Sequence, residues 1–399
     1  MNWLVYLFLY NINGDTMIKK IHFIFMLMIF LFITGCNIKE DKKDELVEFL
    51  IDESISDLTE LKELIINNVD SDTLKNDIAG IYDEYLEKVN SFSKVSEISK
   101  LNKEYKDKIY EQVPVNLGEL DFTNLSEDDK KELLNLLDKY LYRTNLIGIP
   151  LSKSYSLNLN STSASSWEYF FGENGTITKT PKEEYWNVLP FLSNEYFLRG
   201  LNLCLNKELF ENYENLNTES QIDYSKYRYY DYNLDKARKY FRLAITELVE
   251  NNIYNPTKDS PIVLNIEISY GKFTDLNKCE EIHSIIKESI EEAFNTKEVS
   301  NEQFLINVNH WEGEYFGQIY SQKLYNGHFD ISFDKISDST LDFNPYKEYL
   351  LRSSNAILSN GLTVNWSHDT GDINYDCIIY NGYRYSYDEV LLALKASLL

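Results

Sequence analysis

The 399-residue chain lacks features that several classes of protein require. It has only four cysteines, and Cys204, Cys279 and Cys377 are too widely spaced for a disulfide scaffold or a Cys-x-x-Cys metal site, so buried free thiols are expected. Lys and Arg number 39 against 64 Asp and Glu, which gives a formal net charge of −25, and no basic block occurs. Because nothing is present to neutralise a phosphate backbone, no nucleic-acid partner is expected.

The common catalytic motifs are also missing. The sequence contains no H-E-x-x-H, G-x-S-x-G, G-x-G-x-x-G or Walker A motif. The segment His310–Glu314 could ligate a metal, but polar residues are usual at a strand-to-helix junction. Asp372–Asp376 imitates the start of a calcium loop, yet Cys377 replaces its glycine and Tyr383 its last carboxylate. The sequence therefore predicts no enzyme, no metal and no cofactor.

Only the first 35 residues contain an apolar stretch of near-membrane length. Lys19 and Lys20 precede the apolar run Ile21–Ile33. The run ends in Phe32–Cys36 (Phe-Ile-Thr-Gly-Cys), which looks like a bacterial lipobox. We interpret residues 1–35 as a lipoprotein signal peptide and Cys36 as the cysteine that is lipidated and palmitoylated. The alternative is a transmembrane anchor, for which the run is short.

This interpretation predicts where the protein lies. Met17 directly precedes the two lysines and is the expected true start. Acyl chains on Cys36 would hold the chain on the cell membrane, and since no later segment is apolar enough to span it, the rest would lie on the extracytoplasmic side.

The remaining chain is long enough for two or more sub-domains. Residues 36–112 are predicted to form a charged tether and two or three amphipathic helices, because apolar residues recur at helical spacing as far as Pro114. Residues 113–190 are predicted to contain a helix capped by Ser126 and two short strands, at 145–151 and 154–160. Residues 366–399 would form a turn-rich return segment and a C-terminal helix.

Residues 191–365 are predicted to form one α/β lobe, and the clearest pattern lies between 261 and 334. Helices are predicted at Tyr196–Tyr213 and Leu234–Val249. Strands and helices then alternate as β-α-β-α-β, which requires a parallel sheet. These five elements are predicted at 262–268, 276–294, 304–309, 311–326 and 329–333.

Aromatic and acidic residues near these strands are candidate ligand contacts. Trp311 and Trp366 could form the walls of a pocket, although ordinary packing explains most tryptophans equally well. Acidic residues are spaced along the last strand and the loop after it, where α/β sheets bind ligands and where carboxylates could pair with an ammonium. A solvated acidic loop is the alternative. These residues are Asp330, Asp334, Asp338 and Asp342.

Several stretches, taken in order, resemble extracellular solute-binding protein family 5, the oligopeptide-binding lipoproteins of ABC importers. The helix 194–210 carries an Arg-Gly-Leu and an Asn-Lys-Glu pattern, and Asp235–Phe241 carries a Lys-Ala pattern. The strand region Tyr325–Phe333 contains Phe-Asp, and Ser339–Pro345 is similar to the family's loop with a proline. Gly361–Trp366 and Asn145–Leu151 are similar to segments of a clostridial branch.

The resemblance implies an α/β fold, with a lobe like that of type II periplasmic-binding proteins after a helical N-terminal region. It further implies that the protein binds a peptide-like solute, has an ABC permease as its partner, and catalyses no reaction. In the family, an Asp after the Phe-Asp strand can hold a peptide's ammonium, and Asp338 matches it best, with Asp342 second. Family chains have a much larger first lobe, so the alternative is a degenerate surface lipoprotein that acts through protein contacts.

Overall fold

The computed structural model describes residues 44–67, 69–115, 122–130, 133, 148–151, 155–159, 172–174, 179, 181–184, 186–213, 231–270, 276–310, 328–335, 356–357, 363–364, 378–385, 390 and 393–394. The predicted signal peptide and the predicted helix at 311–326 lie outside them. The chain divides into two compact units, Met1–Glu48 and Phe49–Leu399, and the architecture below is that of the second. Among the described helices, none combines the length and the apolar character needed to cross a membrane.

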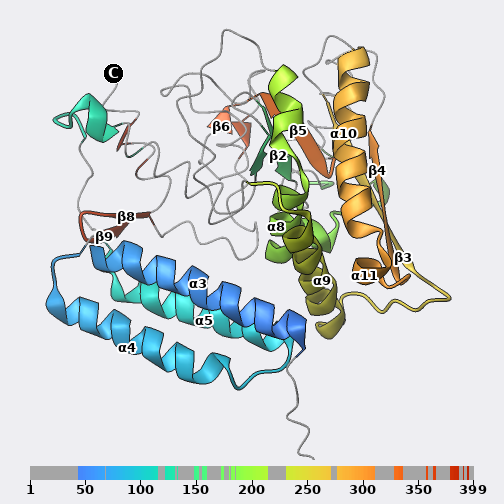
Figure 1. The fold of residues 1–399 in the computed structure, drawn as a ribbon. Coiled ribbons are helices and arrows are strands. Elements are labelled where there is room, and N and C mark those ends of the chain that lie inside the picture. Colours follow the sequence, from blue (N-terminus) through green and yellow to red (C-terminus); the bar gives the residue numbers. More distant parts are fainter. Residues whose placement is uncertain are drawn as a thin grey trace, which may run out of the picture. The chain divides into compact units, whose positions relative to one another are not determined.

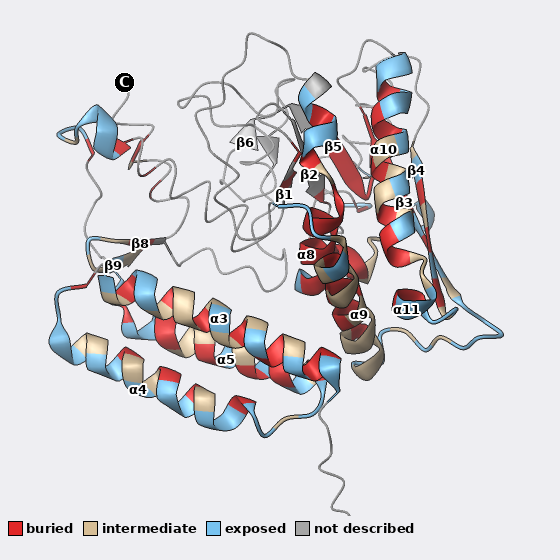
Figure 2. Cartoon of the chain, viewed as in Figure 1, coloured by how far each residue is buried: buried red, intermediate tan, exposed pale blue. Residues whose placement is uncertain are grey.

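Three amphipathic helices begin the described chain, as the apolar spacing predicts. They are α3 (Glu45–Asn67), α4 (Asp72–Val89) and α5 (Val95–Gln112) (Figure 1). The Ser71 hydroxyl caps α4 by accepting a hydrogen bond from the Leu74 N–H at 3.3 Å. Helix α5 ends just before Pro114, as predicted. Figure 2 shows buried residues along one side of α4 and of α5 and exposed residues on the other.

The predicted helix at 196–213 is wrong in its second half. Helix α8 (Glu195–Cys204) starts at Asn194, whose side chain accepts from the Phe197 N–H at 3.0 Å, and ends where Leu205 is extended. A 3₁₀ helix, η5 (Lys207–Tyr213), follows. Beyond the helix end, the Lys207 side chain turns back and donates to the Asn202 carbonyl, one of the carbonyls that a helix end leaves unpaired.

Helix α9 (Leu234–Glu250) packs closely against α8 and confirms the predicted helix at 234–249. The Asn233 side chain caps it by accepting from the Lys236 N–H at 2.9 Å. The close approach depends on Gly200, because a Cβ there would stand 2.6 Å from the Phe241 ring. Aromatic rings fill the core beyond this contact, in edge-to-face pairs of Phe191, Phe197, Phe241, Phe294 and Phe304.

The predicted parallel sheet is present. Strand β3 (Ile262–Ser269) pairs in parallel with β4 (Phe304–His310) and with β5 (Ile331–Lys335). Strands β1 (Gly148–Pro150) and β2 (Tyr155–Leu159) join the same sheet with antiparallel pairing, which gives the order β1-β2-β5-β3-β4. The chain is thus a mixed α/β protein with three parallel strands and a helical N-terminal region.

Helix α10 (Leu276–Phe294), which has the predicted bounds, contacts β4 and is followed by the short α11 (Lys297–Ser300). Its end closes part of the sheet's outer edge with side chains. The Asn295 amide exchanges two hydrogen bonds of 2.8 Å with the backbone of Ile306, and Glu291 accepts from the Val308 N–H at 2.8 Å. These contacts occupy backbone groups that an edge strand otherwise exposes.

Short elements complete the described chain. They are the 3₁₀ helices η3 (Lys182–Glu184) and η4 (Pro190–Ser193), the pair β6 (Ala356–Ile357) and β7 (Thr363–Val364), and the hairpin β8 (Ile378–Tyr380) and β9 (Tyr383–Tyr385). The hairpin turns at Asn381 and Gly382, both with positive φ, in the region predicted to be turn-rich. The Arg384 N–H donates to the Pro114 carbonyl at 2.8 Å, so the hairpin contacts the segment that follows α5.

Candidate functional site

The strand order identifies one edge of the sheet as the candidate site. The three parallel strands are met along the chain as β3, β4 and β5, but they lie in the order β4-β3-β5. After β3, the chain therefore forms β4 on one side of β3, and β5 lies on the other side of β3. In open α/β sheets, ligands bind in the crevice outside the carboxyl ends of the strands at such a reversal. Here that point lies at Ser269 and Tyr270, between β3 and β5.

A buried aromatic cluster stands at this edge. Tyr270 follows β3, His310 ends β4, and His283 projects from α10. The Tyr270 hydroxyl and His283 Nδ1 share a hydrogen bond of 3.2 Å, and the rings of His283 and His310 lie 4.2 Å apart between centroids. The Tyr270 ring also lies 5.3 Å from that of Phe333 on β5. One cluster thus connects the carboxyl ends of β3 and β4 with β5.

The cluster favours neutral side chains. Burial, together with the neighbouring His310 and Lys287, lowers the pKa of His283 to about 4. Burial raises the pKa of Tyr270 well above its usual value and that of Cys279 to about 11. Both rings and the thiol are therefore uncharged at neutral pH. No group of three or more His, Cys, Asp or Glu side chains that could hold a metal ion occurs among the described residues.

Asp330, one of the four candidate carboxylates, has a structural role. It is buried at the start of β5 and accepts hydrogen bonds from the Trp186 indole at 3.1 Å and from the Glu267 N–H at 2.8 Å. Its own N–H donates to the Glu267 carbonyl at 3.3 Å. The Trp186 ring in turn stacks on His328 at 5.9 Å. Asp330 therefore connects the start of β5 to β3 through hydrogen bonds.

Two serines lie at the same edge. Ser269 is the last residue of β3 and Ser332 the second residue of β5, and their Cα atoms are paired in the parallel register. Their exposed fractions are 0% and 1%. Neither hydroxyl has a hydrogen-bond partner in the part of the chain that the structure describes.

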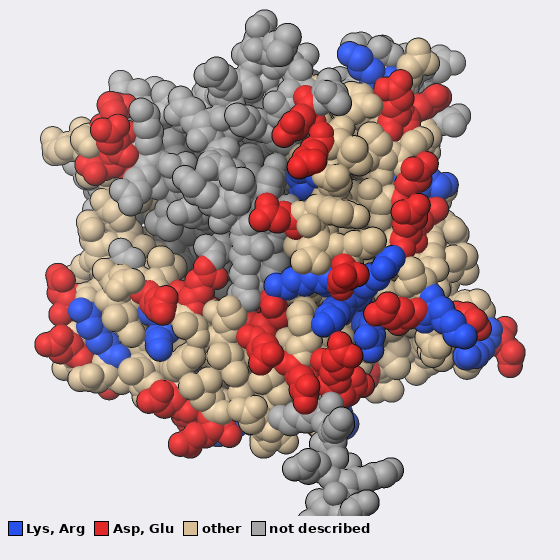
Figure 3. All heavy atoms as spheres, in the orientation of Figure 1, with Lys and Arg blue, Asp and Glu red and all other residues tan. Residues whose placement is uncertain are grey.

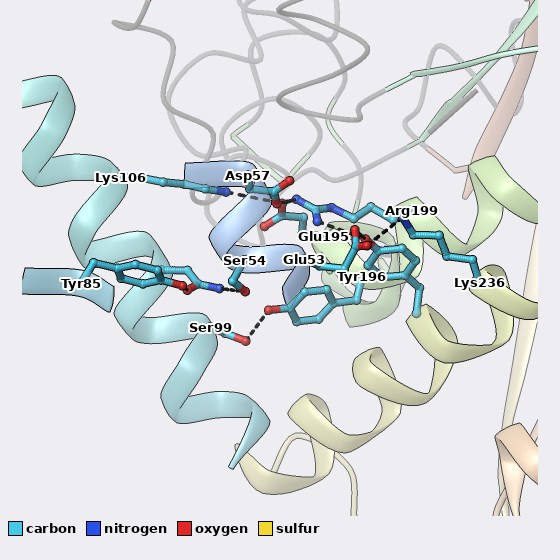
Figure 4. Close-up of polar contacts among 12 residues, drawn as sticks. Glu53, Ser54, Asp57, Tyr85, Ser99, Lys106, Glu195, Tyr196, Arg199 and Lys236 are labelled. Atoms are coloured by element: carbon cyan, nitrogen blue, oxygen red, sulfur yellow. Dashed lines mark hydrogen bonds and ion pairs between the residues drawn. The ribbon is translucent and has the colours of Figure 1, made fainter. Parts of the chain in front are cut away.

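A second polar site joins the N-terminal helices to α8 and α9 (Figure 4). Arg199 on α8 is 5% exposed, and its guanidinium donates to Asp57 on α3 at 2.6 Å, to Glu195 one helical turn earlier, and to the Tyr240 hydroxyl on α9 at 3.5 Å. Burial by itself would raise the pKa of Glu195, but the charges of Arg199 and Lys106 lower it below its usual value.

Further hydrogen bonds extend this network. The Tyr240 hydroxyl donates to Glu53 at 2.5 Å, and Lys236 pairs with the same carboxylate at 2.8 Å. Separate links join the helices, among them Tyr85 to Asn102 at 2.5 Å, Asn102 to Ser54 at 2.6 Å, and Ser99 with Tyr196 at 2.7 Å. Since its members are largely buried and already bonded to one another, the network is suited to holding helices together rather than to binding a solute.

Basic side chains gather on α9 although the protein is acidic overall. Figure 3 shows Lys and Arg over this helix with Asp and Glu around them. Lys236 pairs with Glu53, and Arg242 lies 4.0 Å from Glu298. Because carboxylates accompany these cations, the patch does not resemble a phosphate-binding surface.

Two buried groups on α8 and η5 have displaced pKa values. Burial raises the pKa of the Cys204 thiol to about 12 and lowers that of Lys207 to about 7. Cys204 and Cys279 are both buried and free, as predicted.

The five site residues chosen from the sequence lie outside the described residues. They are Cys36, Trp311, Asp338, Asp342 and Trp366. Sequence reasoning did not single out Ser269, Ser332, Tyr270 or His283. The one sign in the sequence is that Ser269 ends a strand otherwise rich in isoleucine, because the reversal of strand order is seen only in the structure.

Comparison with protein-family models, with curated proteins and with solved structures finds no match to this chain.

Proposed function

We propose that the chain is a membrane-anchored, extracytoplasmic solute-binding protein of an ABC importer, with a peptide-like solute. The observation that carries the proposal is the order β4-β3-β5 of the three parallel strands, with polar groups at the carboxyl ends. This order supports a lobe of the type II periplasmic-binding-protein kind, which the resemblance of residues 194–210, 235–241 and 325–345 to family 5 implies. In this role the protein binds and delivers its solute without chemical change.

The proposed anchor is Cys36. Cleavage before it would leave a mature chain that begins with a lipidated cysteine, and acyl chains on that residue suffice for stable attachment. The proposed partners are the solute, the permease and the membrane. The charge of −25 supports cationic or neutral solutes over anionic ones.

A second function is favoured by the helical region. Helices α3 and α5 are bonded to α8 through the pairs Asp57–Arg199 and Ser99–Tyr196. A three-helix unit fixed in this way next to the solute-binding lobe would suit a surface lipoprotein that acts through protein contacts. In that case the sheet would be retained as a scaffold only.

A ligand screen separates the two functions. Thermal shift and calorimetry with an equimolar pool of synthetic tripeptides to pentapeptides should reveal binding, because a ligand that binds only the native state stabilises it. Asp338→Asn should then weaken binding by roughly 30-fold, since losing the partner of a desolvated charge pair costs about 2–5 kcal/mol. Asp342→Asn is the second choice.

Asp259→Asn is a matched control. Asp259 is exposed and lies before β3, at the opposite end of the strand from the candidate site. The Asp259→Asn variant should bind the peptide pool as the unmodified protein does. Absence of any binding by the unmodified protein would favour the surface lipoprotein, and unchanged binding in both Asp338→Asn and Asp342→Asn would remove the proposed ammonium site.

A further inference from the structure

The hydroxyls of Ser269 and Ser332 are buried polar groups whose situation calls for an explanation. Both side chains are almost completely inaccessible, with exposed fractions of 0% and 1%, and neither hydroxyl has a hydrogen-bond partner among the described residues. Buried polar atoms in folded proteins nearly always have partners, because water that is removed must be replaced. An orphaned pair therefore leaves two hydroxyls available to a partner outside the described residues.

The two hydroxyls form a pair by register. Ser269 and Ser332 are Cα partners in the parallel ladder of β3 and β5, so both side chains lie on the same face of the sheet. Neighbouring strands stand roughly 4.8 Å apart. Two hydroxyls at that spacing can bracket a small planar group, with one accepting a hydrogen bond and the other donating one.

Their position is that of the candidate site. Ser269 ends β3, and the reversal of strand order lies between β3 and β5. The position outside the carboxyl ends of the strands at such a reversal is where open α/β sheets bind ligands. At this position, unpaired hydroxyls are better explained by a ligand contact than by imperfect packing, which would explain them elsewhere in the core.

Asp330 and two other buried serines differ from the pair in having hydrogen-bond partners. Asp330, two residues before Ser332, accepts from Trp186 and from the Glu267 backbone. Among other buried serines, Ser54 accepts from Asn102 at 2.6 Å and Ser300 donates to the Thr296 carbonyl at 2.9 Å.

The charges nearby indicate the class of ligand group. Glu267 lies two residues before Ser269 on β3 and therefore on the same face of that strand, and Asp330 directly precedes β5. Two carboxylates repel an anionic ligand. A neutral group with both a donor and an acceptor fits best, and a peptide amide is such a group.

We propose that Ser269 and Ser332 bind an amide group of the solute, with one hydroxyl accepting from its N–H and the other donating to its carbonyl. This inference rests on the proposed solute-binding function and adds to it a second contact, separate from the acidic loop after β5. It assigns to the sheet edge the recognition of an uncharged part of the solute.

The test combines binding and stability in single variants. Ser269→Ala and Ser332→Ala should each weaken binding of the peptide pool about fivefold in calorimetry, because each loses one neutral hydrogen bond to the solute. Their melting temperatures without peptide should be unchanged or higher, since removing an unpaired buried hydroxyl removes a cost. Ser300→Ala is the matched control, and it should lower the melting temperature and leave peptide binding unchanged.

Each outcome is informative. If the unmodified protein binds the pool and both alanine variants bind equally well, solvent satisfies the hydroxyls and the inference is wrong, whereas the proposed function stands. A melting temperature that falls in both variants without peptide would show an internal partner and also overturn it. Binding of succinate or glutarate in place of peptides would overturn the assignment to an amide. If the unmodified protein binds no peptide, both the function and this inference fail.

Discussion

Arg199 provides the sharpest test of the network that joins the helices to α8 and α9. We predict that Arg199→Met lowers the free energy of unfolding by about 3 kcal/mol at neutral pH. Methionine keeps much of the apolar stem, so the loss reports the charge rather than a cavity. The reason is that Asp57, whose side chain is only 14% exposed, loses the cation that stands 2.6 Å away.

The size of the effect follows from the burial of the pair. The Arg199 side chain is 6% exposed, whereas the ends of the surface pair Lys258 and Glu302 are 60% and 61% exposed at 4.0 Å. Removing one partner of a buried pair typically costs about 3–5 kcal/mol, and we take the lower end because Lys106 remains 3.7 Å from Glu195. An exposed pair contributes about 0–1 kcal/mol, so Lys258→Met is a matched control that should change little.

Urea unfolding followed by circular dichroism measures the loss, and a double variant tests the cause. Once Arg199 is methionine, Asp57→Leu should restore part of the stability, because the isolated carboxylate is gone. The coupling free energy between the two positions should be about 2 kcal/mol. Additive losses in Arg199→Met and Asp57→Leu would refute the reasoning, and so would a loss for Arg199→Met no larger than that for Lys258→Met.

Two further predictions concern the lobe. Because the folded-state pKa of His283 is lowered from 6.5 to about 4, its contribution is fully present above pH 6.5 and is lost as the pH falls toward 4. Thermal melts should show that roughly 2 kcal/mol of stability is lost over that window, an amount reduced for solvent screening. His283→Gln should flatten this dependence of stability on pH. Equal slopes for the variant and the unmodified protein would disprove the assignment to His283. In helices, Gly200→Ala should destabilise by about 1–3 kcal/mol because its Cβ would meet the Phe241 ring at 2.6 Å, whereas Gly80→Ala, with nothing within 4 Å, should stabilise by about 0.5–1 kcal/mol. Urea midpoints that move in the same direction for both would contradict this pair.

The sequence predicts most of the described helices and strands, since local patterns suffice for them. The bounds of α10 and the parallel strands β3, β4 and β5 follow from apolar periodicity alone. The break at Leu205 could not be predicted, because the apolar pattern runs through it from α8 into η5. Nor does periodicity reveal that β2 pairs with β5, because pairing between distant segments leaves no local pattern.

The candidate site is less predictable than the fold. The reversal at the carboxyl end of β3 follows from the order of strands in space, which a one-dimensional pattern does not contain. Asp330 illustrates the limit, because the sequence suggests a ligand contact and the structure gives its oxygens to Trp186 and Glu267. Ser269 and Ser332 look like ordinary polar residues until the register places them side by side.

The pairing of β2 with β5 also has a consequence for how the chain folds. Leu157 pairs with Phe333, a residue almost half the chain away, so a growing polypeptide emerges with β1 and β2 long before their partner exists. Closing so large a loop is slow, and an unpaired strand is prone to non-native association meanwhile. The sheet can therefore be completed only late, when β5 has been made, and until then β2 lacks the strand beside which it lies in the folded protein.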